Sequence, residues 1–516
     1  MKTTKKSIYN ILFGVLGQIV TIAFGVILPR LFLVSYGSET NGFLSSVNQL
    51  YVYLTLLEAG VGAATVQALY GPIGRGDRDK ISGIISATNK FYKRTGLVYM
   101  AGVAVLAVGY PFVIQSDIPH LTQVAIILLL GGSGVLNYFF QAKYRLLLQA
   151  EGKQYILTNI TTIIHLLTSI TKIVLIYCGL NIIWLQVAHL VFTLCQIAYY
   201  AYYINKHYKW LNVKAQPDED AISQKNSALL HQLAQMVFNH TDVLILTLFT
   251  NLKIVSVYVI YNTLVDMIST LIGNINSGFI YKLGQIYNTD KPRYLRMFEA
   301  YETYYMALSF ALYAVTYMFL LPFMRLYTAG ITDANYLLEW LPLMFIAYKT
   351  MVCGRAACGQ TVSFAGHFRQ TQWRSVLEAA INLVISIIAV ILCDLYWGNG
   401  IYGVLVGTIV ALLYRSNDMI IYANKHLLDR SCWVTYRKWV LDIALMAGLV
   451  LLFNLIPNKD LSSYWTIILW AAGAAIVSLG VYFVLNSLFN RKAYLQIKSY
   501  AKDIISSRFN KRRITQ

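Results

Sequence analysis

The sequence predicts an all-α integral membrane protein with about fourteen transmembrane helices, on three observations. Of its 516 residues, 57% are hydrophobic and only 13% are charged, whereas soluble domains carry roughly 25% charged residues. Apolar segments of at least about 20 residues, the length that crosses a bilayer, recur along the whole chain. Basic residues gather in alternate connections between these segments. The net charge of +19 is therefore interpreted as a topology signal, and nucleic acid is not an expected partner.

The apolar segments follow one another with short connections. They lie at 8–34, 42–69, 95–114, 122–143, 156–178, 182–204, 227–250, 255–281, 298–322, 336–358, 374–395, 400–422, 438–456 and 464–488. The first is predicted to be a transmembrane helix and not a cleaved signal peptide, because its apolar run has no small-residue cleavage site. No soluble segment is long enough to hold a conventional active site, so no enzyme is predicted.

The distribution of basic residues predicts the orientation. If both termini are cytoplasmic, the inner connections and ends carry 37 of the 42 lysines and arginines. The five others are Arg30, Lys172, Lys253, Arg325 and Lys459. The positive-inside rule therefore predicts a multi-pass protein with both termini in the cytoplasm. The basic stretch 491–513 is expected to form an amphipathic helix that binds membrane lipids at the inner surface.

Two pairs of similar connections indicate an internal repeat. The stretch 70–80 aligns with 281–291 at an offset of 211, and Gly152 aligns with Gly366 at an offset of 214. Six helices per copy insert the same way up, so two parallel six-helix lobes are expected. The predicted divisions are an N-terminal lobe (1–204), a cytoplasmic linker (205–226), a C-terminal lobe (227–422), helices thirteen and fourteen (423–488) and a basic cytoplasmic tail (489–516).

Cysteine usage points to no cofactor. The six cysteines form no CxxC pair and lie mostly in or beside apolar runs. They are interpreted as small hydrophobic residues, and no metal site is predicted.

Several motifs resemble a known family. They are Glu58-Ala-Gly-Val-Gly62 with Leu69-Tyr70-Gly-Pro, Asn239-His-Thr-Asp242-Val-Leu-Ile with Val257-Tyr258, Glu378-Ala-Ala-Ile-Asn382, and Gly400-Ile-Tyr-Gly403-Val-Leu-Val-Gly407-Thr408. With them, most of the chain resembles the polysaccharide transporters, the lipid-linked oligosaccharide (O-antigen type) flippases of the multidrug/oligosaccharidyl-lipid/polysaccharide exporter superfamily. The chain departs from the family at Thr250-Asn-Leu-Lys253, where a glycine-containing turn is usual.

The resemblance implies a flippase of the bacterial inner membrane. Such a protein moves polyprenyl-diphosphate-linked oligosaccharide repeat units to the outer leaflet by alternating access, for surface polysaccharide biosynthesis. Other membrane proteins of polysaccharide assembly are candidate partners. Two alternatives stay open: an ion-coupled multidrug exporter of the same superfamily, and a polytopic polysaccharide polymerase or ligase. A coupling ion, H⁺ or Na⁺, is also left open.

Four basic residues within the apolar segments are candidate contacts for a diphosphate: Arg30, Lys172, Lys349 and Arg355. Cations in a cavity that excludes water bind such an anion through charge-assisted hydrogen bonds. Arg355 has an alternative, as does Arg415: each could reach the inner lipid headgroups, and for Arg415 this interpretation is favoured. Polar residues also recur on one face of 156–178, which includes Lys172, and of 374–395.

Five further polar residues are candidates for gating or coupling. The offset of 211 places Arg30 opposite Thr241, so Arg30 and Asp242 are predicted to form a gate pair with His240 nearby. The alternative is that Arg30 extends to the outer interface and Asp242 has local hydrogen bonds. The acids Glu58, Asp266 and Glu378 could carry a coupling ion, or each could neutralise a nearby cation.

Overall fold

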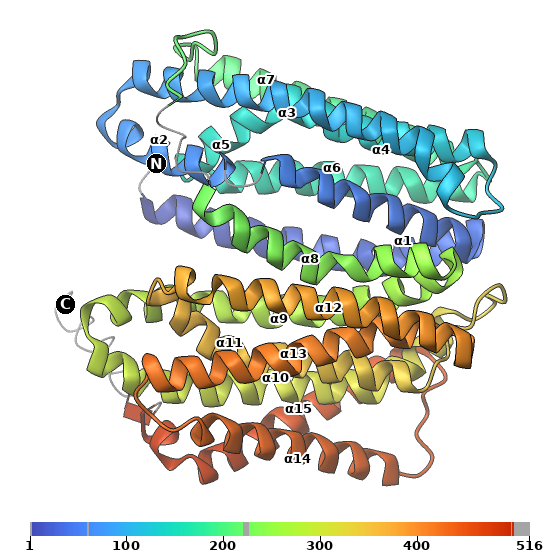
Figure 1. Cartoon of the computed structure of the whole chain (residues 1–516), viewed down its shortest axis with the longest axis vertical. Helices are drawn as coiled ribbons and strands as arrows, with labels where there is room; N and C mark the ends of the chain where they lie inside the picture. The colour runs from blue at the N-terminus through green and yellow to red at the C-terminus, as the bar shows by residue number, and fades with distance from the viewer. Residues whose placement is uncertain (1–2, 59–60, 220–225, 497, 500–516) are drawn as a thin grey trace, which may run out of the picture. The chain divides into compact units, whose positions relative to one another are not determined.

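The computed structural model describes residues 3–58, 61–219, 226–496 and 498–499, in which helices and short turns alternate and no strand occurs (Figure 1). Eleven helices of this described part are long and apolar enough to cross a membrane. All fourteen apolar segments overlap helices. A helical protein of many membrane spans is therefore supported, while the count of fourteen and the six-helix lobes stay predictions.

The helices group into two compact units, of which unit 1 comprises residues 1–259 and 331–334. Its helices are α1 (Thr3–Leu54), α2 (Val61–Arg75), α3 (Arg78–Val113), α4 (His120–Leu136), α5 (Ala142–Ala150), α6 (Gln154–Tyr177), α7 (Ile182–His207) and α8 (Asn226–Phe249), with short helical turns at Thr55–Glu58 and Asn137–Gln141. α1 packs on α6 and α8, and α4 packs between α3 and α7. The first residues of α9 (Leu252–Thr289) also belong to unit 1.

Unit 2 comprises residues 260–330 and 335–516. It holds the rest of α9 with α10 (Lys291–Tyr327), α11 (Trp340–Phe364), α12 (Phe368–Trp397), α13 (Ile401–His426), α14 (Trp433–Leu455) and α15 (Tyr464–Phe489). α13 packs on both α11 and α12, whereas α14 and α15, coloured red in Figure 1, both pack on α10.

A kink at Gly37 divides α1 between the first two predicted segments. Gly37 has a φ of 80°, a conformation that glycine adopts without a Cβ clash. The helix restarts at Ser38, whose backbone N–H and hydroxyl both donate to the Asp333 carboxylate at 2.7 Å. Asp333 therefore caps the second half of α1 from a distant part of the sequence, as an N-cap side chain would.

Part of the predicted linker packs on α3. The hydroxyl of Ser86 donates to the Ala215 carbonyl at 2.7 Å, and Lys90 pairs with Glu219 at 2.7 Å. The rest of the predicted linker at 220–225, and the predicted lipid-binding helix from residue 500 onward, lie outside the described residues.

Glycines let α13 approach α12 closely, as the Gly403-xxx-Gly407 spacing indicates. A Cβ added at residue 403 would lie 2.3 Å from the backbone nitrogen of Val390, and one at residue 407 would lie 2.1 Å from Ser386 Oγ. Such contacts are far inside van der Waals distance, so any side chain here would separate the two helices.

We therefore expect Gly403→Ala to lower the free energy of unfolding by about 1–3 kcal/mol, the usual cost of overpacking. The matched control is Gly448→Ala in α14, where an added Cβ meets nothing within 4 Å. That change should be neutral or stabilising by up to about 1 kcal/mol, because alanine favours helix. Thermal unfolding midpoints of the full chain in detergent measure both, and equal midpoints would contradict the close-packing argument.

Candidate functional site

Five charged side chains of α11, α12 and α13 form a chain of alternating sign. Arg355 Nη1 lies 2.7 Å from Glu378 Oε1, and Arg415 Nε lies 3.3 Å from Glu378 Oε2. Arg415 Nη1 then lies 2.7 Å from Asp418 Oδ2, and Asp418 also contacts Arg374. Each carboxylate is thus shared by two guanidinium groups, and the group as a whole holds one surplus positive charge.

The polar face of α12 explains this arrangement. Asn382 donates to Thr408 at 3.0 Å, and Ser386 donates to the Val404 carbonyl at 3.4 Å. The polar residues spaced three and four apart on α12 therefore turn toward α13, which brings Glu378 to Arg415. The expectation that Arg415 reaches lipid headgroups is wrong, because only 3% of this residue is exposed and its side chain binds two carboxylates.

A second ion pair joins α9 and α11. Lys349 contacts the Asp266 carboxylate directly. Asn262 donates to the same carboxylate at 2.9 Å and accepts a hydrogen bond from Tyr348 at 3.0 Å. For Asp266, the structure therefore favours the neutralisation of a nearby cation, and the side chain of Lys349, at 13% exposed, is the more buried partner.

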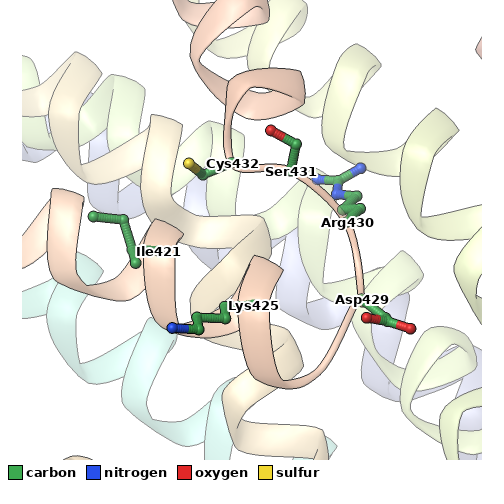
Figure 2. Close-up of a pocket in the computed structure, with 6 residues that line it drawn as sticks. All are labelled: Ile421, Lys425, Asp429, Arg430, Ser431 and Cys432. Atoms are coloured by element: carbon green, nitrogen blue, oxygen red, sulfur yellow. The ribbon is translucent and has the colours of Figure 1, made fainter.

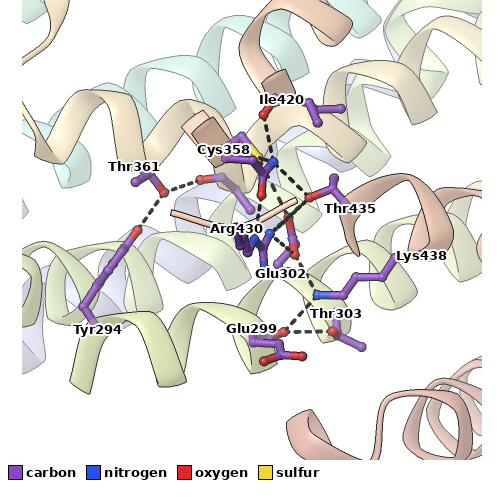
Figure 3. Close-up of polar contacts among 12 residues, drawn as sticks. Tyr294, Glu299, Glu302, Thr303, Cys358, Thr361, Ile420, Arg430, Thr435 and Lys438 are labelled. Atoms are coloured by element: carbon purple, nitrogen blue, oxygen red, sulfur yellow. Dashed lines mark hydrogen bonds and ion pairs between the residues drawn. The ribbon is translucent and has the colours of Figure 1, made fainter. Parts of the chain in front are cut away.

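Glu302 of α10 is at the centre of a third group, shown in Figure 3. This glutamate is fully buried and accepts hydrogen bonds from Arg430 Nη2 at 2.7 and 2.8 Å, Lys438 Nζ at 2.7 Å and Thr435 Oγ1 at 2.8 Å. Arg430 Nε donates to Asn424 at 2.6 Å. One carboxylate thereby ties α10 to the α13–α14 connection and to the first two turns of α14.

Two of the predicted gating residues of unit 1, His240 and Asp242, lie on α8. Asp242 is 6% exposed and accepts a hydrogen bond from Tyr258 at 2.7 Å. Its neighbour Thr241 bonds Tyr53 of α1 at 2.7 Å. His240 is half-buried. These contacts hold α8 against α1 and the start of α9, while the gate pair between Arg30 and Asp242 stays a prediction.

Glu58 closes the short helical turn after α1. It hydrogen-bonds the hydroxyl of Tyr92 on α3, and Arg145 of α5 is its cationic neighbour. Glu58 thus connects this turn with α3 and α5 of unit 1.

Lys172 differs from the other predicted cations. It lies on α6 and acts electrostatically on His165 of the same helix and His189 of α7. Among the described residues, no carboxylate forms an ion pair with Lys172. The hydroxyls earlier on this face have a packing role, since Thr158 and Thr162 lie directly against Gly17 of α1.

The described residues contain no group of three or more histidine, cysteine, aspartate or glutamate side chains able to hold a metal ion. Cys353, Cys358 and Cys393 are buried, and none of the described cysteines is in a disulfide.

Comparison with known proteins places the fold. No family model matches the chain, and no curated protein sequence matches it. Among solved structures it is similar to lipid II flippase MurJ in an inward closed conformation, with a TM-score of 0.62 and 13% identity over 93% of this chain and 99% of that one. It is also similar to a multidrug resistance MATE family transporter of the MOP superfamily in its inward-facing conformation (TM-score 0.64, 13% identity, 79% of this chain and 94% of that one) and to one in its outward-facing conformation (0.53, 14%, 82% and 95%).

This chain has the fold of these membrane transporters. The likeness concerns the fold, and the family and the substrate belong to the proposal below.

Sequence reasoning missed the two acids with the clearest structural roles in the described part, Glu302 and Asp333. Glu302 lies near the start of the apolar segment 298–322, where an acid is easily assigned to the membrane surface. The sequence indicates its partners Arg430 and Lys438 only as topology signals. The sequence does contain one clue. Glu302 lies within four residues of the start of segment 298–322, while Arg430 and Lys438 lie before and at the start of segment 438–456, which is predicted to begin on the same side of the membrane.

The Lys349–Asp266 pair makes an asymmetric prediction. Asp266→Asn should destabilise the protein more than Lys349→Met, because it leaves the more buried charge without its carboxylate, at a cost of roughly 1–3 kcal/mol. The side chain of Asp266 is 46% exposed and can regain water when Lys349 is lost. The double variant should recover most of the loss. Unfolding midpoints of the four proteins in detergent measure this, and a double variant less stable than Asp266→Asn would contradict the pairing.

Proposed function

We propose that this protein is a transporter that flips polyprenyl-diphosphate-linked oligosaccharide repeat units from the inner to the outer leaflet of a bacterial cytoplasmic membrane, for surface polysaccharide biosynthesis. The transporter fold supports the general function. One of the similar structures is a lipid II flippase. No chemical change of the substrate is required, so the protein acts as a carrier and not as an enzyme.

The observation that carries the substrate class is that Lys172 forms no ion pair with a carboxylate among the described residues. A cation half-buried among helices costs free energy unless an anion neutralises it. Lys172 has two histidines as electrostatic neighbours and no carboxylate pair among the described side chains. An anionic substrate group supplies the missing charge, and a diphosphate does so with several acceptor oxygens.

Two of the other predicted diphosphate contacts, Lys349 and Arg355, already have carboxylate partners. Lys349 and Arg355 pair with Asp266 and Glu378, so in our proposal they exchange these carboxylates for the diphosphate as the substrate enters. Because exchange replaces one anion by another, it requires little net loss of ion pairing. Arg30 is proposed as a further diphosphate contact.

In this proposal the acidic residues act in gating and in ion coupling. Asp242 with His240 acts in gating, and Glu58, with Asp266 and Glu378 once their cations leave them, can take up a coupling ion, H⁺ or Na⁺. An acid that loses its cation partner in a dry site gains affinity for a proton or a metal cation.

The second candidate is an ion-coupled multidrug exporter. It is favoured by the TM-score of 0.64 to the inward-facing multidrug resistance transporter. An exporter of cationic drugs needs unpaired acids in its cavity. Among the described residues Lys172 instead has no carboxylate in an ion pair with it, and Glu378 already contacts two arginines.

Transport by the purified full chain in proteoliposomes tests these alternatives. A fluorescent lipid-linked oligosaccharide placed in one leaflet should equilibrate faster than in empty vesicles, and its mass should be unchanged afterwards. A cationic dye driven by a proton or sodium gradient is the parallel arm. Dye transport with no acceleration of the lipid would overturn the proposal in favour of the exporter.

A further inference from the structure

A pocket of about 460 Å³ opens where α13 ends and α14 begins, within unit 2 (Figure 2). It is lined by Ile421, Lys425, Asp429, Arg430, Ser431 and Cys432. The proposed transport mechanism uses none of these residues. The volume falls in the range of small-molecule sites, roughly 300–1,000 Å³.

Two cations contribute to this pocket in different ways. Lys425 is exposed, and none of the ion pairs found among the described residues involves it. Arg430 is fixed by Glu302 and Asn424, which bind its Nη2 and Nε and leave Nη1 out of these bonds. The pocket therefore combines one exposed cation with one that hydrogen bonds hold in place.

The only acid in the lining does not neutralise the lysine. The side chains of Lys425 and Asp429 point in opposite directions in Figure 2, and the described ion pairs include none between them. Behind the pocket, the group of Glu302, Arg430 and Lys438 carries one surplus positive charge. The lining as a whole therefore favours an anion.

Apolar side chains beside the pocket indicate that the anion carries acyl chains. Ile421 lies one turn from Lys425 on α13 (Figure 2) and is 47% exposed. Trp433, at the start of α14 and next to the lining residue Cys432 in sequence, is 71% exposed. Exposed tryptophan next to basic residues is typical of the boundary between hydrocarbon and headgroups. The segment 415–438 is also one of the basic stretches that the positive-inside rule assigns to the cytoplasmic side.

We infer that this pocket binds the phosphate of an anionic phospholipid from the inner leaflet. Lys425 Nζ and Arg430 Nη1 donate to the phosphate oxygens, Ser431 Oγ donates a further hydrogen bond, and the acyl chains lie along Ile421 and Trp433. Because Arg430 also holds Glu302, a bound phosphate contacts the same side chain that anchors α14 to α10.

Cys432 provides a direct probe, since its thiol lines the pocket and is not in a disulfide. The full chain in detergent is treated with a soluble maleimide, and labelling of Cys432 is measured by peptide mass spectrometry. Phosphatidylglycerol added to the micelles should slow labelling several-fold, whereas phosphatidylcholine should not. Lys425→Gln should raise the lipid concentration that gives half-maximal protection by about fivefold, which corresponds to the loss of one basic residue near an anionic surface.

The matched control is Lys291→Gln, which removes one exposed positive charge of unit 2 outside the pocket and should leave protection unchanged. Inorganic phosphate is the third arm, and protection by phosphate without protection by the lipid would overturn the lipid as ligand. Equal protection by phosphatidylcholine, or full protection of the Lys425→Gln variant, would overturn the site itself.

Discussion

Glu302→Ala is expected to destabilise this protein more than the other single substitutions considered above. The carboxylate is fully buried and accepts bonds from Arg430, Lys438 and Thr435. Removing it leaves two cations in the interior without an anion, and breaking a buried ion pair in this way costs about 3–5 kcal/mol. The thermal unfolding midpoint of the full chain in detergent should fall accordingly.

A control one turn away separates this effect from general damage to α10. Glu299 offers only its backbone carbonyl to Lys438 and Thr303, so Glu299→Ala keeps those bonds and should change the midpoint little. A Glu302→Ala protein as stable as Glu299→Ala would contradict the argument.

A second substitution at Lys438 tests whether the negative charge of Glu302 causes the loss of stability. Glu302→Gln should also be destabilising, because the amide neutralises neither Arg430 nor Lys438. Adding Lys438→Met removes one of the two cations and replaces it with an apolar side chain of similar length. The double variant should therefore be more stable than Glu302→Gln, since replacing buried charges together is far less costly than removing one partner.

The loss of Glu302 should act mainly on the last two helices. Within unit 2, α14 is held to α15 by Asn486 and Tyr482, which both donate to Asp442, the first to its carboxylate at 2.8 Å and the second to its carbonyl at 2.7 Å. These bonds do not involve Glu302. The α14–α15 hairpin should therefore stay paired while its attachment to α10 weakens, which hydrogen exchange would detect as faster exchange at the start of α14.

The helices, and the residues that share one side of a helix, could be predicted from the sequence. Periodicity places Glu378, Asn382 and Ser386 on one side of α12, and the Gly403-xxx-Gly407 spacing indicates close helix packing at α13, although it does not identify α12 as the partner. Both follow from the helical repeat, which relates residues three and four apart.

Pairing could not be predicted in the same way, because a partner lies on another helix at a distance in sequence that no local pattern encodes. Arg355 and Glu378 were assigned different roles, substrate binding and coupling, although they touch at 2.7 Å. Asp333 reaches Ser38 across 295 positions. Burial also reverses the meaning of a basic residue: Lys438, counted as a cytoplasmic signal, is 1% exposed and neutralised by Glu302.

Lys172 provides the sharpest test of function, because its removal should have opposite effects on stability and transport. In the free protein this half-buried cation has no carboxylate pair among the described residues, so Lys172→Met should leave the unfolding midpoint unchanged or raise it. Transport of a diphosphate-linked lipid should fall by roughly 10- to 100-fold, since a hydrogen bond to a charged group contributes about 1.5–3 kcal/mol.

Two further variants test whether the loss of transport in Lys172→Met is due to the positive charge at residue 172. Lys172→Arg keeps the cation and should retain part of the transport rate, although a planar guanidinium binds phosphate with different geometry. Lys80→Met removes an exposed cation of unit 1 whose side chain is in none of the ion pairs of the described residues, and should transport at the rate of the unaltered protein. A stable Lys172→Met protein with full transport would show that the cation contributes nothing to the substrate. Binding sites commonly lower the stability of a protein in exchange for function. Here the cation that costs folding free energy in the empty protein is the one that the anionic substrate neutralises.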